Sequence, residues 1–212
     1  MIGIYGGTFD PVHYGHLRSA LEVKEALDLD EVRFLPCGVP PHRRSPEAPA
    51  HLRLRMLELA LQDAEPGFRI DARELEREGP SYMMDTLVSL REELADRPLC
   101  LILGKDAFAG LPSWHRWREL FDQAHMIVMK RPDAPEPVTD EVLAELVRGR
   151  RVDDAGALQS RPAGLVHEVE VTRLAIAATR IRQLLRAGKS PRYLLPDPVL
   201  DLIREQKLYG DG

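Results

Sequence analysis

The chain has 212 residues, of which 44% are hydrophobic and 30% are charged, a composition typical of a folded globular protein. Its formal net charge of −5 disfavours general binding to nucleic acid, although a local basic cluster can still bind a small anion. No apolar run approaches the roughly 20 residues of a membrane-spanning helix, and the first residues lead into a glycine loop rather than a signal peptide.

Short apolar runs alternate with segments of helical periodicity along the chain. We predict strands at 1–5, 32–35, 68–72, 99–103, 124–129 and 166–171. We predict helices at 14–27, 51–64, 81–95, 140–147, 179–187 and 198–206. Ser81 is the expected N-cap of the third helix. This alternation indicates βαβ units and a mostly parallel sheet, whose ligands bind beyond the carboxyl ends of the strands.

The two cysteines give no sign of a disulfide framework or a zinc site. Cys37 and Cys100 lie far apart in the sequence and form no Cys-x-x-Cys pair. Such sparse cysteine usage fits a reducing compartment, so we expect a cytoplasmic protein.

The most informative segment joins the first predicted strand to the first helix and reads GGTFDPVHYGH at residues 6–16. Gly6 and Gly7 allow the backbone to approach a phosphate closely, and the helix N-terminus offers N–H groups to an anion. His13 and His16 are three residues apart at the start of the helix, so both can face one ligand. The segment contains neither a Gly-x-Gly-x-x-Gly fingerprint nor a Walker-type lysine.

Residues 13–16 resemble the His-x-Gly-His signature of the nucleotidylyltransferase superfamily. Gly15 would leave room between the histidines for a flat base or a ribose. Class I aminoacyl-tRNA synthetases carry a similar signature, but they also carry a Lys-Met-Ser-Lys-Ser loop, which this sequence lacks.

The resemblance to one branch of that superfamily, the bacterial nicotinate-nucleotide adenylyltransferases, extends along essentially the whole chain. The segments that carry it are PCGVPPHR (36–43), PSYMMDTL (80–87), LGKD (103–106), LPSWHRW (111–117), KRP (130–132) and AATRIR (177–182). Three residues differ from those usual in the family: Cys37 replaces Asn, Met83 replaces Thr, and Ala177 replaces Ser. Each replacement removes one polar contact to a substrate.

The resemblance implies a set of ATP-binding residues. They are Gly6, Gly7, Thr8, Phe9, His13, His16, Gly104, Asp106, Thr179 and Arg182. Within this set the implied catalytic residues are His13, His16 and Arg182, with His16 nearest the transferring phosphorus. Thr179 would cap its helix and turn the helix N-terminus toward the ATP phosphates.

A second set is implied for the mononucleotide. Its members are His42, Arg43, Met83, Met84, Trp114 and Arg131. Trp114 would stack on the pyridine ring, and the N–H groups at the start of the helix near Ser81 would receive the nicotinate carboxylate. Trp117 is expected in the hydrophobic core.

The implied reaction is attack of the nicotinate mononucleotide phosphate on the α-phosphate of ATP, with release of pyrophosphate. Magnesium would come with the ATP phosphates and take few protein ligands. The implied fold is a doubly wound, Rossmann-like α/β domain over 1–172, with a small helical subdomain at 173–212 packed across the cleft.

Two other functions remain open from the sequence. One is a different adenylyltransferase of the superfamily, with pantetheine phosphate or nicotinamide mononucleotide as acceptor. The other is a nucleotide-binding module without catalysis, which the replacements at Cys37, Met83 and Ala177 would favour. The partners expected are ATP and nicotinate mononucleotide, with neither nucleic acid nor membrane, and the sequence leaves monomer and homo-oligomer equally open.

Overall fold

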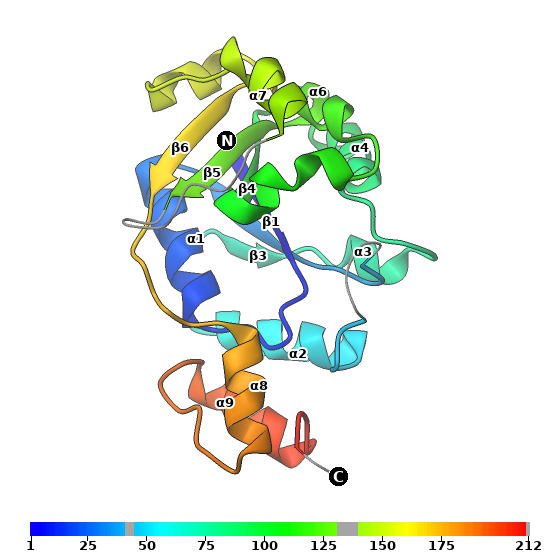
Figure 1. Cartoon of the computed structure of the whole chain (residues 1–212), viewed down its shortest axis with the longest axis vertical. Coiled ribbons are helices and arrows are strands. Elements are labelled where there is room, and N and C mark those ends of the chain that lie inside the picture. The colour runs from blue at the N-terminus through cyan, green and yellow to red at the C-terminus, as the bar shows by residue number, and fades with distance from the viewer. Residues whose placement is uncertain (41–44, 131–139, 211–212) are drawn as a thin grey trace.

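The computed structural model describes residues 1–40, 45–130 and 140–210, and its strands form one six-stranded sheet (Figure 1). The strands are β1 (Ile2–Gly7), β2 (Glu31–Pro36), β3 (Phe68–Ile70), β4 (Leu99–Gly104), β5 (His125–Lys130) and β6 (Val166–Glu170). Each coincides with a predicted strand, with ends that differ by two residues or fewer.

The longer helices are also those that the sequence predicts. They are α1 (Tyr14–Ala26), α2 (Ala50–Leu61), α4 (Met83–Leu94), α7 (Glu141–Arg148), α8 (Ala178–Arg186) and α9 (Asp197–Glu205). Several short helical segments were not predicted, because one or two turns are too short to show a periodic pattern. These are α3 (Arg73–Glu76), α5 (Lys105–Ala109), α6 (Leu120–Gln123) and the 3-10 turns η1 (Leu111–Ser113), η2 (Trp117–Glu119) and η3 (Ala155–Ser160). No described helix is long and apolar enough to cross a membrane.

All pairings in the sheet are parallel, and the strand order is β3-β2-β1-β4-β5-β6. This is the order of a doubly wound Rossmann-like sheet, as predicted. The chain moves outward from β1 in one direction and then returns to start β4 on the other side of β1. The crevice at the carboxyl ends of β1 and β4 is therefore the topological switch point, where such sheets bind their ligands.

Both faces of the sheet are covered, which explains why its strands read as continuous apolar runs. In β4, Cys100 and Ile102 belong to the hydrophobic cluster on one face, while Leu99, Leu101 and Leu103 belong to the cluster on the other. The first cluster is covered by α1, α2, α8 and α9, and the second by α4, α5, α6 and α7. The alternation of side chains along β4 and β5 thus divides the residues of each of these strands between the two clusters.

The C-terminal helices lie below the sheet, next to α2 (Figure 1). Ile181 of α8 and Leu200 of α9 are buried in the same hydrophobic cluster as Phe34 of β2. The helices α8 and α9 therefore share a hydrophobic core with the sheet.

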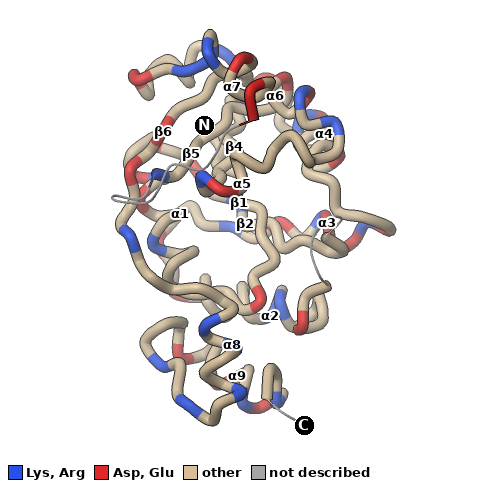
Figure 2. The backbone as a smooth tube through the Cα atoms, in the orientation of Figure 1, with Lys and Arg blue, Asp and Glu red and all other residues tan. Residues whose placement is uncertain are grey.

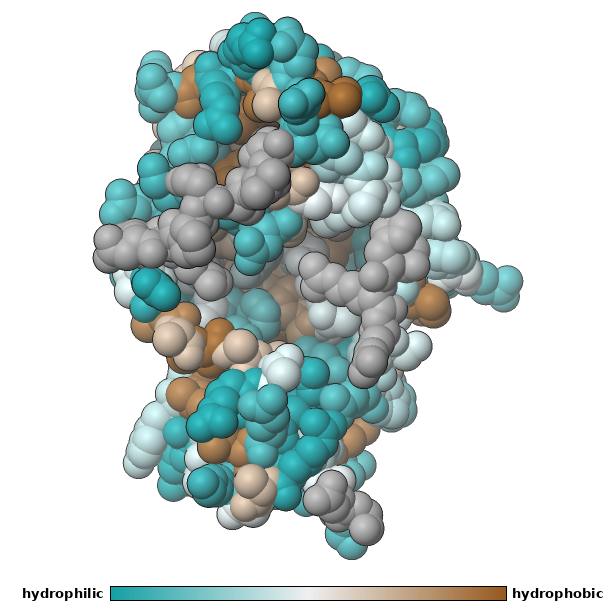
Figure 3. Space-filling view, viewed as in Figure 1, coloured by the Kyte–Doolittle hydropathy of each residue, from teal (hydrophilic) through white to brown (hydrophobic). Residues whose placement is uncertain are grey.

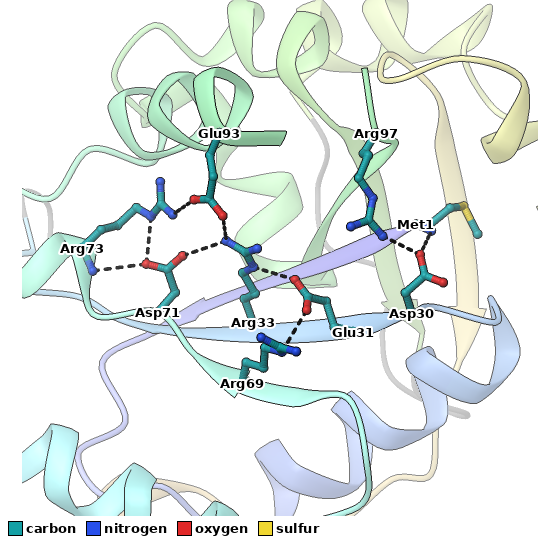
Figure 4. Close-up of polar contacts among 9 residues, drawn as sticks. All are labelled: Met1, Asp30, Glu31, Arg33, Arg69, Asp71, Arg73, Glu93 and Arg97. Atoms are coloured by element: carbon teal, nitrogen blue, oxygen red, sulfur yellow. Dashed lines mark hydrogen bonds and ion pairs between the residues drawn. The ribbon is translucent and has the colours of Figure 1, made fainter. Parts of the chain in front are cut away.

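Ion pairs connect β2 to the helices beside it (Figure 4). Arg33 of β2 donates hydrogen bonds to Glu31, Asp71 and Glu93, and Arg73 bridges Asp71 and Glu93 in turn. Burial would raise the pKa of Asp71, but hydrogen bonds from Arg73 and the charge of Arg33 lower it overall. Elsewhere acidic and basic residues are interspersed over the molecule (Figure 2).

Candidate active site

A pocket of about 1060 Å³ opens at the carboxyl ends of β1 and β4, where the strand order reverses. Figure 3 shows a hollow near the middle of the viewed face, above the C-terminal helices. The structure places twelve of the predicted site residues in the pocket lining: Gly6, Gly7, Thr8, Phe9, His13, His16, Met83, Gly104, Asp106, Trp114, Thr179 and Arg182. Segments far apart in the sequence thus form one cavity.

The glycines at the end of β1 make room for side chains of the protein itself. A Cβ atom on Gly6 would lie 2.8 Å from Cε of Met83, and one on Gly7 would lie 3.0 Å from the ring of Phe9. Phe9 adopts a φ of 49°, in the left-handed region, and its side chain is buried. The glycine loop therefore packs closely around the ring of Phe9, before the chain continues to His13 and His16.

His13 and His16 lie stacked at the start of α1. Their ring centroids are 3.7 Å apart with an interplanar angle of 24°. The backbone N–H of His13, the N-cap residue, donates to Nδ1 of His16 at 3.3 Å. Because Nδ1 of His16 is an acceptor, its ring hydrogen is on Nε2, which makes Nε2 a donor. Both histidines line the pocket, as their spacing predicts.

Gly15 leaves room for a neighbouring side chain of the protein. A Cβ atom at this position would lie 3.0 Å from both Cε1 and Nδ1 of His13 and 3.4 Å from the carbonyl oxygen of Ile176. The absence of a side chain at Gly15 therefore allows the imidazole of His13 to pack against the start of the helix. Gly15 also lines the pocket, so room for a base or a ribose beside it stays a prediction.

Asp10, buried in the loop after β1, connects three parts of the chain. Its carboxylate accepts hydrogen bonds from the backbone N–H groups of Glu47 and Ala48, at 2.8 and 3.1 Å. It also accepts one from the Tyr209 hydroxyl, at 2.6 Å. Burial, together with the adjacent carboxylate, raises the pKa of Tyr209, so this hydroxyl stays protonated as the donor. Asp10 thus links the glycine loop to the loop before α2 and to the C-terminus.

Arg182 of α8 lies in the pocket wall and is already engaged with protein groups. Its guanidinium donates to the carbonyl oxygen of Asp10 at 2.7 Å and to Glu47 at 2.8 Å. Glu47 also pairs with Arg186, one turn further along α8. A polyphosphate bound here would compete with the Glu47 carboxylate for the same two arginines.

The N-cap of α8 lies two residues before the predicted one. The sequence predicts Thr179 as the N-cap, but the helix begins at Ala178, and Ala177 occupies the cap without a side-chain hydrogen bond. The hydroxyl of Thr179 instead accepts a hydrogen bond from Nη2 of Arg182 at 3.4 Å. Since alanine cannot cap, the first N–H groups of α8 receive no side-chain cap at the edge of the pocket.

The start of α4 also differs from the prediction. The sequence predicts Ser81 as its N-cap, but the helix begins at Met83 with Tyr82 at the cap. The Ser81 hydroxyl faces the loop after β2, where it accepts from the N–H groups of Gly38 at 2.9 Å and Val39 at 3.2 Å. Serine therefore connects two loops here, while the first turn of α4 is left without a side-chain cap.

An aromatic wall stands beside the start of α4. Tyr82 and His115 lie with ring centroids 4.3 Å apart, and both line the pocket together with half-buried Trp114. Trp117 is buried in the core, which confirms that prediction. Met84, predicted to bind the mononucleotide, is 2% exposed and packs into the core, so its side chain does not reach the pocket.

A buried carboxyl group also contributes to the pocket lining. Glu74 of α3 is 3% exposed, and its Oε1 accepts a hydrogen bond from the Thr86 hydroxyl at 2.7 Å. Burial raises the pKa of Glu74, and hydrogen bonding by Thr86 and the charge of Arg77 only partly offset this effect. The residue joins α3 to α4 on the side of the pocket where the mononucleotide is expected.

Three predicted residues, His42, Arg43 and Arg131, lie outside the described residues. The prediction also missed several residues that shape the site: Asp10, Glu47, Glu74 and the buried Arg53 of α2. Asp10 is within the glycine segment, which is a usable signal. The other three look like ordinary surface charges in the sequence, and only the fold brings them to the pocket or behind it.

The cytidylyltransferase-like family model matches residues 4–184 of the chain. Two solved structures of the Plasmodium falciparum nicotinic acid mononucleotide adenylyltransferase, one complexed with NaAD and one with APC, superpose with TM-scores of 0.72 and 0.70. Each covers 98% of this chain and 96% of its own, at 18% identity, so this similarity establishes the fold.

Relatives found by sequence share a much higher identity with this chain than these structures do. A protein of Methylococcus capsulatus, named a probable nicotinate-nucleotide adenylyltransferase, is 59% identical over 210 residues, which is 99% of this chain and 100% of the relative. A protein of the same name from Aeromonas salmonicida is 49% identical over 208 residues, covering 98% of this chain and 96% of its own. The chain therefore belongs to the cytidylyltransferase-like family and, within it, to the nicotinate-nucleotide adenylyltransferases.

Proposed function

We propose that this chain transfers the adenylyl group of ATP to nicotinate mononucleotide, forming nicotinate adenine dinucleotide and pyrophosphate. The observation that carries the proposal is one pocket that combines stacked histidines at a helix start with an aromatic wall. Phosphates suit the first of these features and a flat pyridine ring the second.

The pocket offers a separate side to each substrate. ATP would lie along the glycine loop and Gly104, with its phosphates between His16 and the start of α8. Asp106 would accept hydrogen bonds from the ribose hydroxyls. The mononucleotide would enter between the loop after β2 and the start of α4, with its ring against Trp114. In this arrangement its phosphate meets the α-phosphate of ATP near His16.

The reaction requires placement and charge neutralisation rather than a base. An oxygen of the mononucleotide phosphate, already an anion, forms a bond to the α-phosphorus while the bond from that phosphorus to the bridging oxygen breaks. The electron pair leaves on pyrophosphate. We assign Nε2–H of His16 as a donor to the α-phosphate oxygens, where negative charge is stabilised. Arg182 would bind the leaving pyrophosphate, which would replace the Glu47 carboxylate as the partner of its guanidinium group.

The residues present fit a magnesium ion that arrives with ATP. No group of three or more His, Cys, Asp or Glu side chains that could hold a metal occurs among the described residues. The two carboxylates on the phosphate side, Asp10 and Glu47, are already bound by donors and arginines. When bound, magnesium supplies charge neutralisation on the phosphates, while protein groups hold the rest of the substrate.

The start of α4 favours an acid over an amide on the pyridine ring. Its first N–H groups have no side-chain cap and lie beside Met83, which lines the pocket. A helix N-terminus favours an anion by about 0.3–2 kcal/mol, depending on burial. An amide would also turn N–H groups toward these donors, which costs about 1–3 kcal/mol. We therefore expect a preference for nicotinate of roughly tenfold or more.

Pyrophosphate release with ATP and magnesium tests the function against its alternatives. The acceptors to compare are nicotinate mononucleotide, nicotinamide mononucleotide and phosphopantetheine, each at several concentrations. The expected result is the highest kcat/KM with nicotinate mononucleotide. A higher value with either other acceptor would assign the chain a different substrate, and no turnover with any acceptor would favour a binding module.

A further inference from the structure

Arg53 of α2 is a buried cation that connects the loops around the pocket. Its side chain is 1% exposed, although arginine is normally found at the surface. Its three hydrogen bonds among the described residues all go to backbone carbonyl oxygens: Nη1 to Thr8 at 2.8 Å, Nη2 to Gly38 at 3.3 Å, and Nε to Ala48 at 3.3 Å. The residue does not itself line the pocket.

These three carbonyl groups belong to two loops. Thr8 is in the glycine loop after β1, whereas Gly38 and Ala48 lie near the start and the end of the loop that joins β2 to α2. The Ala48 peptide is held from its other side as well, because its N–H donates to Asp10. Loops lack the internal hydrogen bonds of helices and strands, so cross-links of this kind determine where they lie relative to one another.

The side chain of Arg53 has the geometry to hold several carbonyl groups at fixed positions. A guanidinium group presents its donors in a rigid plane, whereas the ammonium group of lysine is a single point on a flexible stem. Burying a charge that receives only carbonyl oxygens is costly, so an apolar residue would be expected on the core side of α2 if packing alone mattered. Because packing does not explain a buried arginine here, we attribute Arg53 to its effect on the loops, whose spacing it fixes.

We propose that Arg53 is a positioning residue for adenylyl transfer, because it fixes the ATP-side glycine loop relative to the mononucleotide-side loop after β2. The inference rests on the proposed function, since that function assigns one substrate to each loop. Each loop keeps its own contacts to its own substrate when Arg53 is changed. What is lost is the alignment of the two phosphates in the complex that contains both substrates.

This mechanism predicts a particular kinetic signature. Arg53→Lys and Arg53→Gln should lower kcat by roughly 10- to 100-fold, because a misplacement of about 1 Å between reactants has an effect of that size. The KM values for ATP and for nicotinate mononucleotide should each stay within about threefold of the wild-type values. Loss of stability alone would also lower the apparent kcat at unchanged KM, because it lowers the amount of active enzyme. The kcat is therefore expressed per folded molecule, a quantity that a merely structural role would not change.

Two control variants on the same helix complete the experiment. Leu57→Ala removes a buried apolar side chain, which cannot donate a hydrogen bond to the loops, so it should lower the thermal midpoint but leave kcat per folded molecule unchanged. Arg55→Lys changes an exposed arginine paired with Glu58 and should alter neither quantity. All variants are assayed where circular dichroism shows them folded, with the wild type as the reference for the function itself.

The possible results separate the two proposals. An inactive wild type would overturn the proposed function. With an active wild type, a folded Arg53 variant whose kcat is within about threefold of normal, or whose KM values alone rise, would overturn the positioning role. Failure of both Arg53 variants to fold at any temperature would do the same, since Arg53 would then act on folding as a whole.

Discussion

At the scale of single residues, the orientation of His16 is the feature closest to the chemistry. Its Nδ1 accepts a hydrogen bond from the N–H of His13, so its ring hydrogen is on Nε2. A donor fixed before the reaction stabilises a charged transition state more effectively than one that must reorient. The short spacing between the two histidines thus fixes both a position and a tautomer.

The first prediction concerns this donor. His16→Ala should lower kcat by about 10²–10³, the usual effect of losing one donor to a reacting oxyanion. Steady-state pyrophosphate release measures it, and circular dichroism checks the fold. His51→Ala, on the exposed side of α2, is the matched control and should behave as wild type. A His16→Ala enzyme within a few-fold of wild type would remove His16 from the mechanism.

Trp114 gives a second prediction at the same scale. Stacking of a ring on tryptophan is worth about 1–3 kcal/mol, so Trp114→Ala should raise the KM for nicotinate mononucleotide roughly 5- to 150-fold. The KM for ATP should change little, because Trp114 lies on the other side of the pocket in our arrangement. Trp114→Phe keeps an aromatic face and should show a smaller effect. Equal changes for both substrates would contradict a specific platform for the pyridine ring.

At the scale of elements, the start of α4 is held by contacts that its own sequence does not reveal. Ser81 binds the loop after β2, and Thr86, one turn into the helix, binds Glu74 of α3. The uncapped first turn of α4 is therefore kept in place by its neighbours. Its N–H groups remain available beside the pocket because serine caps a different part of the chain.

The third prediction uses the raised pKa of Glu74. A carboxyl group whose folded-state pKa exceeds its unfolded value of 4.5 stabilises the protein fully below that value, and this contribution is lost as pH rises through the folded-state pKa. Glutamine is neutral at every pH. Glu74→Gln should therefore gain stability relative to wild type as the pH rises from about 4 to about 8.

Urea unfolding of both proteins across this pH range provides the measurement. Asp71→Asn is the control with the opposite sign, because the pKa of Asp71 is lowered in the folded state. The contribution of Asp71 is present above its unfolded pKa and is lost as pH falls through the folded-state value, so this variant should be most destabilised near neutral pH. Parallel stability curves for wild type and Glu74→Gln would contradict a buried carboxyl with a raised pKa.

At the scale of the whole molecule, the C-terminus is part of the active-site framework. Tyr209 reaches back to Asp10 in the first loop, and Arg182 of α8 binds the same loop through its backbone. The hydrophobic cluster that contains Phe34 of β2 also includes residues of α8 and α9. We propose that residues 173–212 act with the sheet domain as one functional unit.

The fourth prediction tests that connection. Tyr209→Phe removes one donor to a buried carboxylate and should lower the free energy of unfolding by about 1.5–3 kcal/mol, the range for hydrogen bonds to charged groups. Denaturant unfolding followed by fluorescence or circular dichroism measures the change. Tyr193→Phe, whose side chain is 82% exposed, should remain within about 0.5 kcal/mol of wild type. Similar stabilities for all three proteins would mean that Asp10 is satisfied without Tyr209.

The sequence alone determined the strands, the longer helices and the order in which they alternate. Apolar runs such as 99–103 are recognisable because both faces of the strand are buried, and helical periodicity extends over several turns. The site segment at 6–16 was also visible, because glycine and paired histidines at a strand end are unusual without a ligand. The segment at 177–182 was identified only through its resemblance to the family. These are properties of local sequence, so they can be read without a fold.

Only the tertiary structure decided which polar groups meet. The cap prediction at Ser81 was wrong because its hydroxyl binds Gly38 and Val39, which lie 43 and 42 residues away in sequence. Thr179 does not cap α8 either, although its partner Arg182 is in the same helix. The partners of Arg53 likewise include a carbonyl group 45 residues away in sequence. A hydrogen bond depends on distances of about 3 Å, and such distances between remote residues exist only once the sheet has assembled.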